Sequence, residues 1–226
     1  MSPEVKPPSQ SVCLVFGDED FLVRDRAKQI YGYWCSLADG MDHEIIDGTV
    51  RNSEEALVAL SRVNEALQTL PFFGGNKVVW LRGVNFFGDD RTASSATVKG
   101  RLAELAKSWE EFDWQGVQLL ISATKVDKRK SFFKSLKKFA ALEDKSFSDK
   151  ERGGRAAMLV SQRLAELGKK ISPHVADELV LFSGANLQQL YTESDKLALY
   201  IGERNEVTRQ DVHEISTRTK QSKAFA

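Results

Sequence analysis

Gly17 stands where a phosphate-binding loop would begin, because it ends the short apolar run 12–16. In the motif Gly-x-x-x-x-Gly-Lys-Ser/Thr, the glycines let backbone N–H groups wrap nucleotide phosphates, the lysine neutralises charge and the hydroxyl holds Mg²⁺. Here the positions of the second glycine, the lysine and the hydroxyl residue hold Leu22, Val23 and Arg24. Residues 18–20 add three carboxylates, which would repel phosphates. The residues therefore predict no phosphate loop.

Metal and thiol chemistry are not indicated either. The three histidines, His43, His174 and His213, are scattered without ligand spacing, and we interpret them as surface or cap-neighbouring residues. Cys13 and Cys35 form neither a disulfide framework nor a metal-ligand pair, and Cys13 lies in a buried-strand pattern typical of a small core residue. We expect no catalytic residue, no metal site and no cofactor.

The charge balance favours no particular partner. Lys plus Arg and Asp plus Glu both number 32, so the net charge is zero, whereas a dedicated nucleic-acid module would usually be more basic. No apolar run has the length of a membrane span. Residues 1–10 contain three prolines and no apolar signal-peptide core, so we expect a disordered lead-in and a cytoplasmic, non-membrane protein.

Residues 11–148 alternate between strand and helix patterns. The run 12–16 is continuously apolar, as in a strand buried on both faces. Further strands are predicted at 43–46, 77–81, 117–122 and 142–147, and helices at 21–31, 53–67 (capped by Ser53), 96–109 and 131–141. Alternating strands and helices predict an α/β domain with a parallel sheet covered on both faces.

Residues 149–226 have a different, helical character. The charged stretch 148–154 is interpreted as a flexible linker, and everything after it as helix. Ser172 and Pro173 form a strong helix start, Asn186 can cap the next helix, and Thr208 can open a last one. A parallel α/β domain followed by a small helical lid domain is the layout of AAA+ proteins, a P-loop NTPase class, although layout alone gives no function.

Two further features of AAA+ ATPases are missing. The strand that positions Mg²⁺ and water should end in Asp-Glu, but here it ends in Arg82 and Gly83. The helical domain should carry an arginine near a Gly-Asp-x-Arg turn, where residues 185–188 place Gln188. We therefore predict an AAA+-like fold without a functional P-loop. A degenerate but active AAA+ ATPase is the alternative, and nucleotide binding would decide between them.

Several segments together resemble the delta subunit family of bacterial DNA polymerase III, an AAA+-like clamp-loader subunit. No segment is specific alone, but their order and spacing are. They are the opening 15–22, the element Leu-Pro-Phe-Phe-Gly at 70–74 with Asn-Lys-Val-Val at 76–79, the segment 127–136, the lid residues 184–200, and 207–212. The family continues into a third, helical collar domain that this chain lacks, so we expect a fragment covering the first two domains.

The resemblance implies that the chain binds a ring-shaped sliding clamp (beta) and opens it for loading onto primed DNA during replication. It implies no ATP hydrolysis of its own, although the DNA polymerase III holoenzyme as a whole is a DNA-directed DNA polymerase. The implied partners of the full-length protein are the tau/gamma and delta-prime subunits of the loader. The sister delta-prime subunit is a less fitting family, since it normally carries a four-cysteine zinc insertion.

The family places the clamp contact at Leu70, Phe72 and Phe73. Pro71 and the glycines at 74–75 are helix-stopping residues, so the two phenylalanines are expected on a turn. A partner pocket that buried them would make them hot spots, since each is worth about 1.5–3 kcal/mol when fully buried. The alternative is that Phe72 and Phe73 cap the core of the sheet.

A basic segment, 125–139, is a second candidate site. Its residues Lys128, Arg129, Lys130 and Lys134 are candidate contacts to the DNA backbone, which would make the chain a DNA-binding module. The alternative is an amphipathic helix with a solvated basic face. Its aromatic residues fit helical core spacing better than base stacking.

Overall fold

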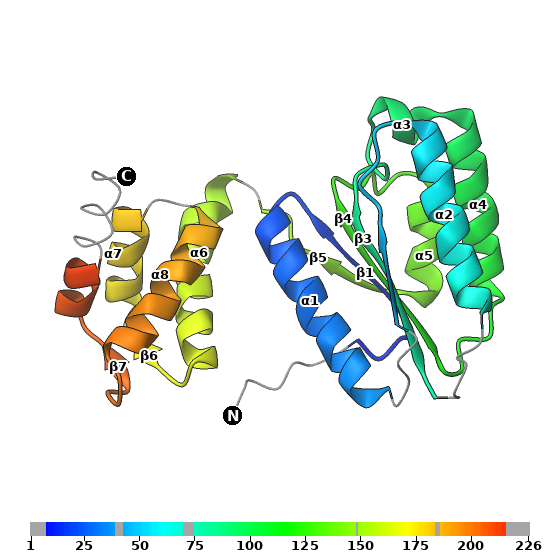
Figure 1. Cartoon of the computed structure of the whole chain (residues 1–226). Helices are drawn as coiled ribbons and strands as arrows, with labels where there is room; N and C mark the ends of the chain where they lie inside the picture. The colour runs from blue at the N-terminus through cyan, green and yellow to red at the C-terminus, as the bar shows by residue number, and fades with distance from the viewer. Residues whose placement is uncertain (1–7, 39–42, 70–74, 148, 184–185, 216–226) are drawn as a thin grey trace. The chain divides into compact units, whose positions relative to one another are not determined.

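The computed structural model describes residues 8–38, 43–69, 75–147, 149–183 and 186–215 (Figure 1). The chain forms two compact units, and the boundary between them lies between Ser146 and Phe147. This division lies two residues before the boundary expected from composition. Each unit has its own core.

The described strands of the first unit form one parallel sheet in the order β2-β3-β4-β1-β5. They are β1 (Val12–Gly17), β2 (Glu44–Asp47), β3 (Lys77–Val84), β4 (Val117–Thr124) and β5 (Ala141–Asp144). Every residue of β1 is buried, as its continuous apolar run predicted. The predicted parallel α/β fold is confirmed.

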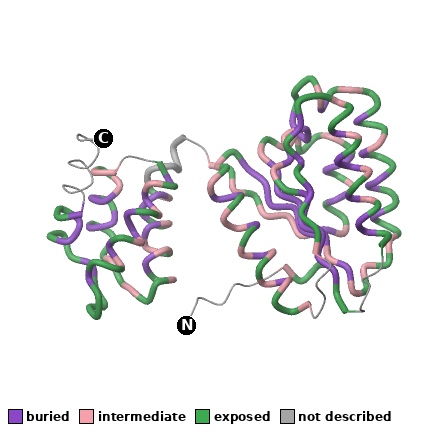
Figure 2. Tube along the Cα trace, in the orientation of Figure 1, coloured by how far each residue is buried: buried purple, intermediate pink, exposed green. Residues whose placement is uncertain are grey.

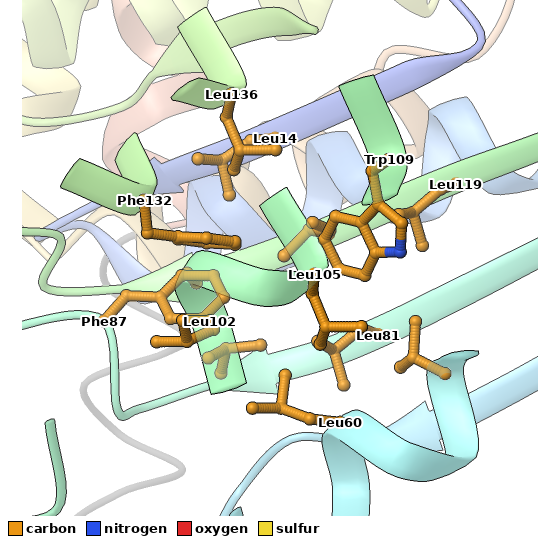
Figure 3. Packing of buried hydrophobic residues seen from close by; sticks show 14 of the residues in the cluster. Leu14, Leu60, Leu81, Phe87, Leu102, Leu105, Trp109, Leu119, Phe132 and Leu136 are labelled. Carbon is orange, nitrogen blue, oxygen red and sulfur yellow. The ribbon is translucent and has the colours of Figure 1, made fainter. Parts of the chain in front are cut away.

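Helices cover both faces of the sheet (Figure 1). On one face, α1 (Asp20–Leu37) packs over residues such as Cys13, Val15 and Trp80. On the other lie α2 (Ser53–Gln68), α4 (Ala96–Glu110) and α5 (Ser131–Phe139). They enclose the larger core, in which Leu14 and Leu119 of the sheet meet Trp109, Phe132 and other residues of these helices (Figure 3).

Several predicted boundaries in the first unit need correction. Asn52, not Ser53, caps α2, because its side-chain oxygen accepts from the amide of Glu55 at 2.9 Å. A short helix, α3 (Arg91–Ser94), was not predicted and begins at an Asp90 cap. The helix predicted to run to 141 ends at Phe139, and β5 starts at Ala141, since Ala141 pairs with Cys13 of β1.

The second unit is built from α6 (Asp149–Glu166), α7 (Pro173–Ser183), α8 (Leu187–Tyr200) and a helical stretch at 209–215. Buried stretches occur on each of these helices (Figure 2). The buried residues include Val160, Leu164, Leu179, Leu190 and Leu197. Asn186 caps α8 as predicted, accepting from the amide of Gln189 at 3.0 Å. Asp211 accepts from the amide of Thr208 at 2.9 Å, as the predicted helix start requires.

Two sequence predictions about this unit are wrong. Residues 149–154 of this stretch are not a flexible linker, because α6 begins at Asp149. The Lys, Glu and Arg residues there favour helix strongly enough to outweigh two glycines. The unit is also not purely helical, since β6 (Lys170–Ile171) pairs in parallel with β7 (Glu206–Val207). The Lys169 ammonium fixes the turn before β7 by donating to the carbonyls of Gly202 and Arg204.

Candidate functional site

The end of β1, where a phosphate loop would start, is covered by other backbone. The amide of Lys145 donates to the carbonyl of Phe16 at 2.6 Å. A Cβ at Gly17 would meet the backbone of Lys145 and lie 2.7 Å from the nitrogen of Ser146. Gly17 is therefore required here for close packing of two chain segments, which is a different use of glycine from wrapping phosphates.

In the first turns of α1, the residues at the positions of the phosphate-binding motif either pack into the core or form a surface ion pair. Leu22 and Val23, at the positions of the motif's second glycine and lysine, are buried. Arg24, at the hydroxyl position, is exposed and pairs with Asp20 one turn earlier at 3.0 Å. The side chains that would neutralise phosphate and hold Mg²⁺ are thus replaced by apolar contacts and an ion pair.

The other two positions that differ from AAA+ ATPases are the end of β3 and the start of α8, where the Asp-Glu pair and the arginine of an ATPase are missing. Arg82 on β3 is exposed and lies 3.8 Å from Asp47 of β2. The next residue, Gly83, has a φ of +70° and donates its amide to the hydroxyl of Ser122. In the second unit, Gln188 is exposed on the first turn of α8. Among the described residues, no three His, Cys, Asp or Glu side chains gather as a metal site would require.

The predicted clamp-binding residues Leu70, Phe72 and Phe73 lie outside the described residues, in the segment 70–74. The chain on either side of this segment is described. Thr69 ends α2, and both its amide and its hydroxyl donate to the carbonyl of Glu65, at 3.1 and 2.8 Å. Lys77 begins β3 on the other side.

Lys77 is the feature of this region that sequence reasoning missed. Its side chain is only 2% exposed, which is rare for a lysine. Its ammonium donates to the Oε1 of Glu44 at 2.8 Å and to the carbonyl of Thr69 at 3.5 Å. A lysine directly before the apolar residues 78–81 was the available signal, but such a side chain usually extends to solvent.

Further hydrogen bonds fix the start of β3. The amide of Lys77 donates to the carbonyl of Gly116 at 2.8 Å, and the amide of Val78 donates to the Nδ1 of His43 at 3.3 Å. Lys77 is thereby held to a residue next to β4 and to the end of α2, and Val78 is held to a residue next to β2. The segment 70–74 is therefore flanked by chain that is fixed on both sides.

The basic segment 125–139 presents less free charge than its composition suggests. Lys128 pairs with Asp144 at 2.5 Å, and Arg129 pairs with Asp127 at 2.9 Å. The Lys130 ammonium donates to the carbonyls of Gly88 and Ala93. The exposed Lys134 side chain makes no hydrogen bond or ion pair with the part of the chain that the structure describes. Contact with DNA stays a prediction for these four residues.

The aromatic residues of this segment belong to the core. Phe132 and Phe133 are buried, and Phe132 packs against Phe87 and Trp109 at ring-centroid distances of 4.8 and 6.2 Å. Their helical spacing predicted this packing correctly. They are therefore not available for stacking on nucleic-acid bases.

An open depression of about 440 Å³ lies beside the basic segment. It is lined by Gly88, Asp89 and residues 125–129, which follow the carboxyl ends of β3 and β4. Hydrogen bonds from Arg129 hold the pKa of Asp127 down to about 2, so this carboxylate stays charged. The depression therefore combines two carboxylates with three cations, a mixture that does not select anions.

The described helices include none that is both long and apolar enough to cross a bilayer. Cys13 is buried, and this burial together with the nearby Glu143 carboxylate raises its thiol pKa to about 12. Its predicted place as a core residue is confirmed.

Comparison with known proteins gives a consistent result. The chain is 26% identical over 220 residues to the DNA polymerase III subunit delta of Bacillus subtilis, covering 95% of this chain and 59% of that protein. It is 23% identical over 216 residues to the probable DNA polymerase III subunit delta of Aquifex aeolicus, covering 93% and 56%. The chain thus spans less than two thirds of the length of these relatives.

The fold has a solved counterpart. The structure of the Bacillus subtilis DNA clamp loader delta protein matches 90% of this chain and 57% of that chain, with a TM-score of 0.65 at 19% identity. This likeness shows that the two proteins share a fold. The family model for "DNA polymerase III, delta subunit" matches residues 14–144, more than half of the sequence. The chain therefore belongs to the DNA polymerase III delta subunit family.

Proposed function

We propose that this chain binds a sliding clamp and opens its ring for loading onto primed DNA. The observation that carries the proposal is the Leu-Pro-Phe-Phe-Gly segment at 70–74, between α2 and β3, in a chain of the delta family. Leu70, Phe72 and Phe73 are the proposed contacts. Two adjacent aromatic side chains entering one apolar pocket would supply the concentrated apolar burial that hot spots have.

Ring opening needs no ATP on this chain. A ligand shifts a conformational equilibrium by the difference between its affinities for the two states. A protein that binds the open clamp better than the closed one therefore opens it on binding. The altered phosphate-loop positions at 22–24 and the backbone packed against Gly17 support an ATP-independent role. In the full-length protein, we expect tau/gamma and delta-prime subunits as partners that control when this surface is exposed.

Calorimetric titration of this chain into the clamp of its own organism, without nucleotide, tests the proposal. We expect wild-type binding, and a loss of about 2 kcal/mol, or roughly 30-fold in Kd, in the variant Phe72→Ala/Phe73→Ala. A matched control is Leu181→Ala/Leu199→Ala, which removes two leucines of the second unit that are each 82% exposed. Equal loss in both variants, or no binding by the wild type, would reject the proposed contact.

A further inference from the structure

Lys125, on the rim of the depression at the carboxyl ends of β3 and β4, has a backbone conformation that lysine rarely adopts. Its φ of +41° lies in the left-handed region, and no other non-glycine residue in the described ranges has a positive φ. The Cβ atom makes this region unfavourable, whereas glycine and asparagine occupy it readily. Either of those residues would form the same turn with less strain, so the turn alone does not explain a lysine here.

The backbone around Lys125 is fixed by the neighbouring loop. The amide of Asp127 donates to the carbonyl of Phe87 at 3.0 Å. A Cβ at Gly88 would lie 2.9 Å from the carbonyl oxygen of Lys125, so the loops after β3 and β4 meet backbone to backbone. The Lys130 ammonium donates to the carbonyl of Gly88 as well. The two loops that line the depression are therefore held together before any partner binds.

The charges that line the depression are not all paired within the chain. Lys128 and Arg129 form ion pairs with carboxylates. The exposed Lys125 side chain makes no hydrogen bond or ion pair with the residues that the structure describes. The same holds for the Asp89 carboxylate, which also lines the depression. The depression therefore offers one unpaired cation and one unpaired carboxylate to a partner.

This charge balance fits a protein surface better than a nucleic acid or a free anion. Binding to a nucleic-acid backbone uses several unpaired cations, and the Asp89 carboxylate would repel phosphate. A protein surface can place a carboxylate against Lys125 and a cation against Asp89 at the same time. Such complementary charges favour the correct partner over others.

The depression is well separated along β3 from the segment proposed to bind the clamp. The segment 70–74 precedes the amino end of β3 at Lys77, whereas the depression follows the carboxyl end of β3 at Val84. The eight residues of β3 span about 26 Å. A protein in the depression therefore does not compete for the residues proposed to contact the clamp.

We propose that this depression is the docking surface for a second protein, which presents a carboxylate to Lys125 and a cation to Asp89. The strained backbone of Lys125 is retained because its side chain is needed for binding, a trade of stability for function. This inference rests on the function proposed above, in which a tau/gamma subunit is an expected partner. That subunit is therefore the protein to test.

Two variants at position 125 separate binding from folding. Lys125→Asn removes the ammonium but suits the left-handed backbone, so it should raise the melting temperature by about 1–4 °C. Lys125→Arg keeps both the charge and the strain. Lys134→Met is the matched control, because it removes another exposed lysine that has no partner among the described residues.

Biolayer interferometry measures binding of this chain to the tau/gamma subunit of its own organism. Chain concentrations reach about 100 µM, because a small polar interface binds weakly. We expect Lys125→Asn to bind about tenfold more weakly than wild type although it is more stable. Lys125→Arg and Lys134→Met should stay within about twofold of wild type.

Three results would overturn the docking surface. They are absence of wild-type binding, unchanged binding by Lys125→Asn, and weaker binding by Lys125→Asn that follows a lowered melting temperature. Displacement of the tau/gamma subunit by primed DNA would also overturn it, because the depression would then be a nucleic-acid contact.

Clamp titration of the same variants keeps this inference apart from the proposed function. Lys125→Asn should bind the clamp as wild type does, and Phe72→Ala/Phe73→Ala should bind the tau/gamma subunit as wild type does. If wild type binds the tau/gamma subunit through Lys125 but does not bind the clamp, the docking surface stands and the proposed function is wrong. The reverse result leaves the clamp contact and rejects the docking surface.

Discussion

The amide of Lys145 donates to the carbonyl of Phe16 across 2.6 Å, so the chain leaving β5 packs against the end of β1. In a nucleotide-binding protein of this layout, the end of the first strand opens into a phosphate loop. Here the neighbouring backbone comes so close that only Gly17 fits. A side chain at position 17 should therefore destabilise the fold.

Gly17→Ala should lower the free energy of unfolding by about 1–3 kcal/mol, because the new Cβ would collide with backbone that cannot move aside cheaply. Gly100→Ala in α4 is the control, since nothing lies within 4 Å of its Cβ position and alanine favours helix by about 1 kcal/mol. Urea unfolding measures both. Equal stability of the two variants would contradict the close packing at Gly17.

The Arg26–Glu143 pair should make the free energy of unfolding depend on pH in the acidic range. Burial raises the pKa of Glu143, but the hydrogen bonds and charge of Arg26 outweigh it and hold that pKa below its usual 4.5. A depressed carboxyl pKa gives stability that is present above 4.5 and is lost as pH falls through the lower folded value.

Glu143→Gln should therefore be less stable than wild type at pH 7, by about 1–3 kcal/mol, and the difference should shrink below pH 4.5. Thermal unfolding followed from pH 7 to pH 3 measures this. A difference that stays constant across that range would mean that Glu143 titrates alike in the folded and unfolded chain.

Hydrophobic patterning predicted most of the fold because the elements bury continuous or periodic apolar faces. The residues 12–16 and 117–122 were recognisable as strands since both lie inside the sheet. The start of α6 was missed because glycine and charge suggest a linker locally, whereas helix formation is cooperative along the whole segment. The β6–β7 pair was missed because two-residue strands carry no periodicity.

The candidate site was less predictable for a different reason. The composition of 125–139 showed many cations, but their partners Asp144, Gly88 and Ala93 lie 16 to 42 residues away. The burial of Lys77 likewise depends on Glu44, which is 33 residues away in sequence. Such pairings come from the topology of the sheet and leave no local pattern in the sequence.

Lys130 and Lys134 should behave differently on substitution. Lys130→Met should lower the melting temperature, because the Lys130 ammonium holds two backbone carbonyls of the 88–93 stretch. Lys134→Met should leave the melting temperature unchanged, since Lys134 is exposed on α5. Differential scanning calorimetry makes the comparison.

The same two variants test the DNA prediction. Fluorescence anisotropy with primed DNA, between about 50 and 200 mM salt, reports how many phosphates are neutralised. We expect weak binding with a shallow salt slope, and a smaller effect of Lys130→Met than of Lys134→Met. A steep slope that Lys130→Met alone reduces would instead assign a DNA contact to Lys130.

The thiols should differ in accessibility. Burial and the nearby Glu143 carboxylate raise the pKa of Cys13 to about 12. Burial also raises the pKa of Cys35, but this thiol is only half-buried. With a disulfide reagent at pH 8, Cys35 should therefore react in the folded protein, and Cys13 only when the chain unfolds. Mass spectrometry of the modified peptides measures this. Modification of Cys13 at the rate of a free thiol would contradict its place in the core.

Ring opening without ATP is the central claim, and clamp release tests it most directly. The clamp is loaded on nicked circular DNA, this chain is added without nucleotide, and DNA-bound clamp is followed over time. We predict that wild type speeds clamp release and that Phe72→Ala/Phe73→Ala does not. Wild-type binding to the clamp with no change in its release from DNA would contradict the claim, and would leave a clamp-binding chain that does not open the ring.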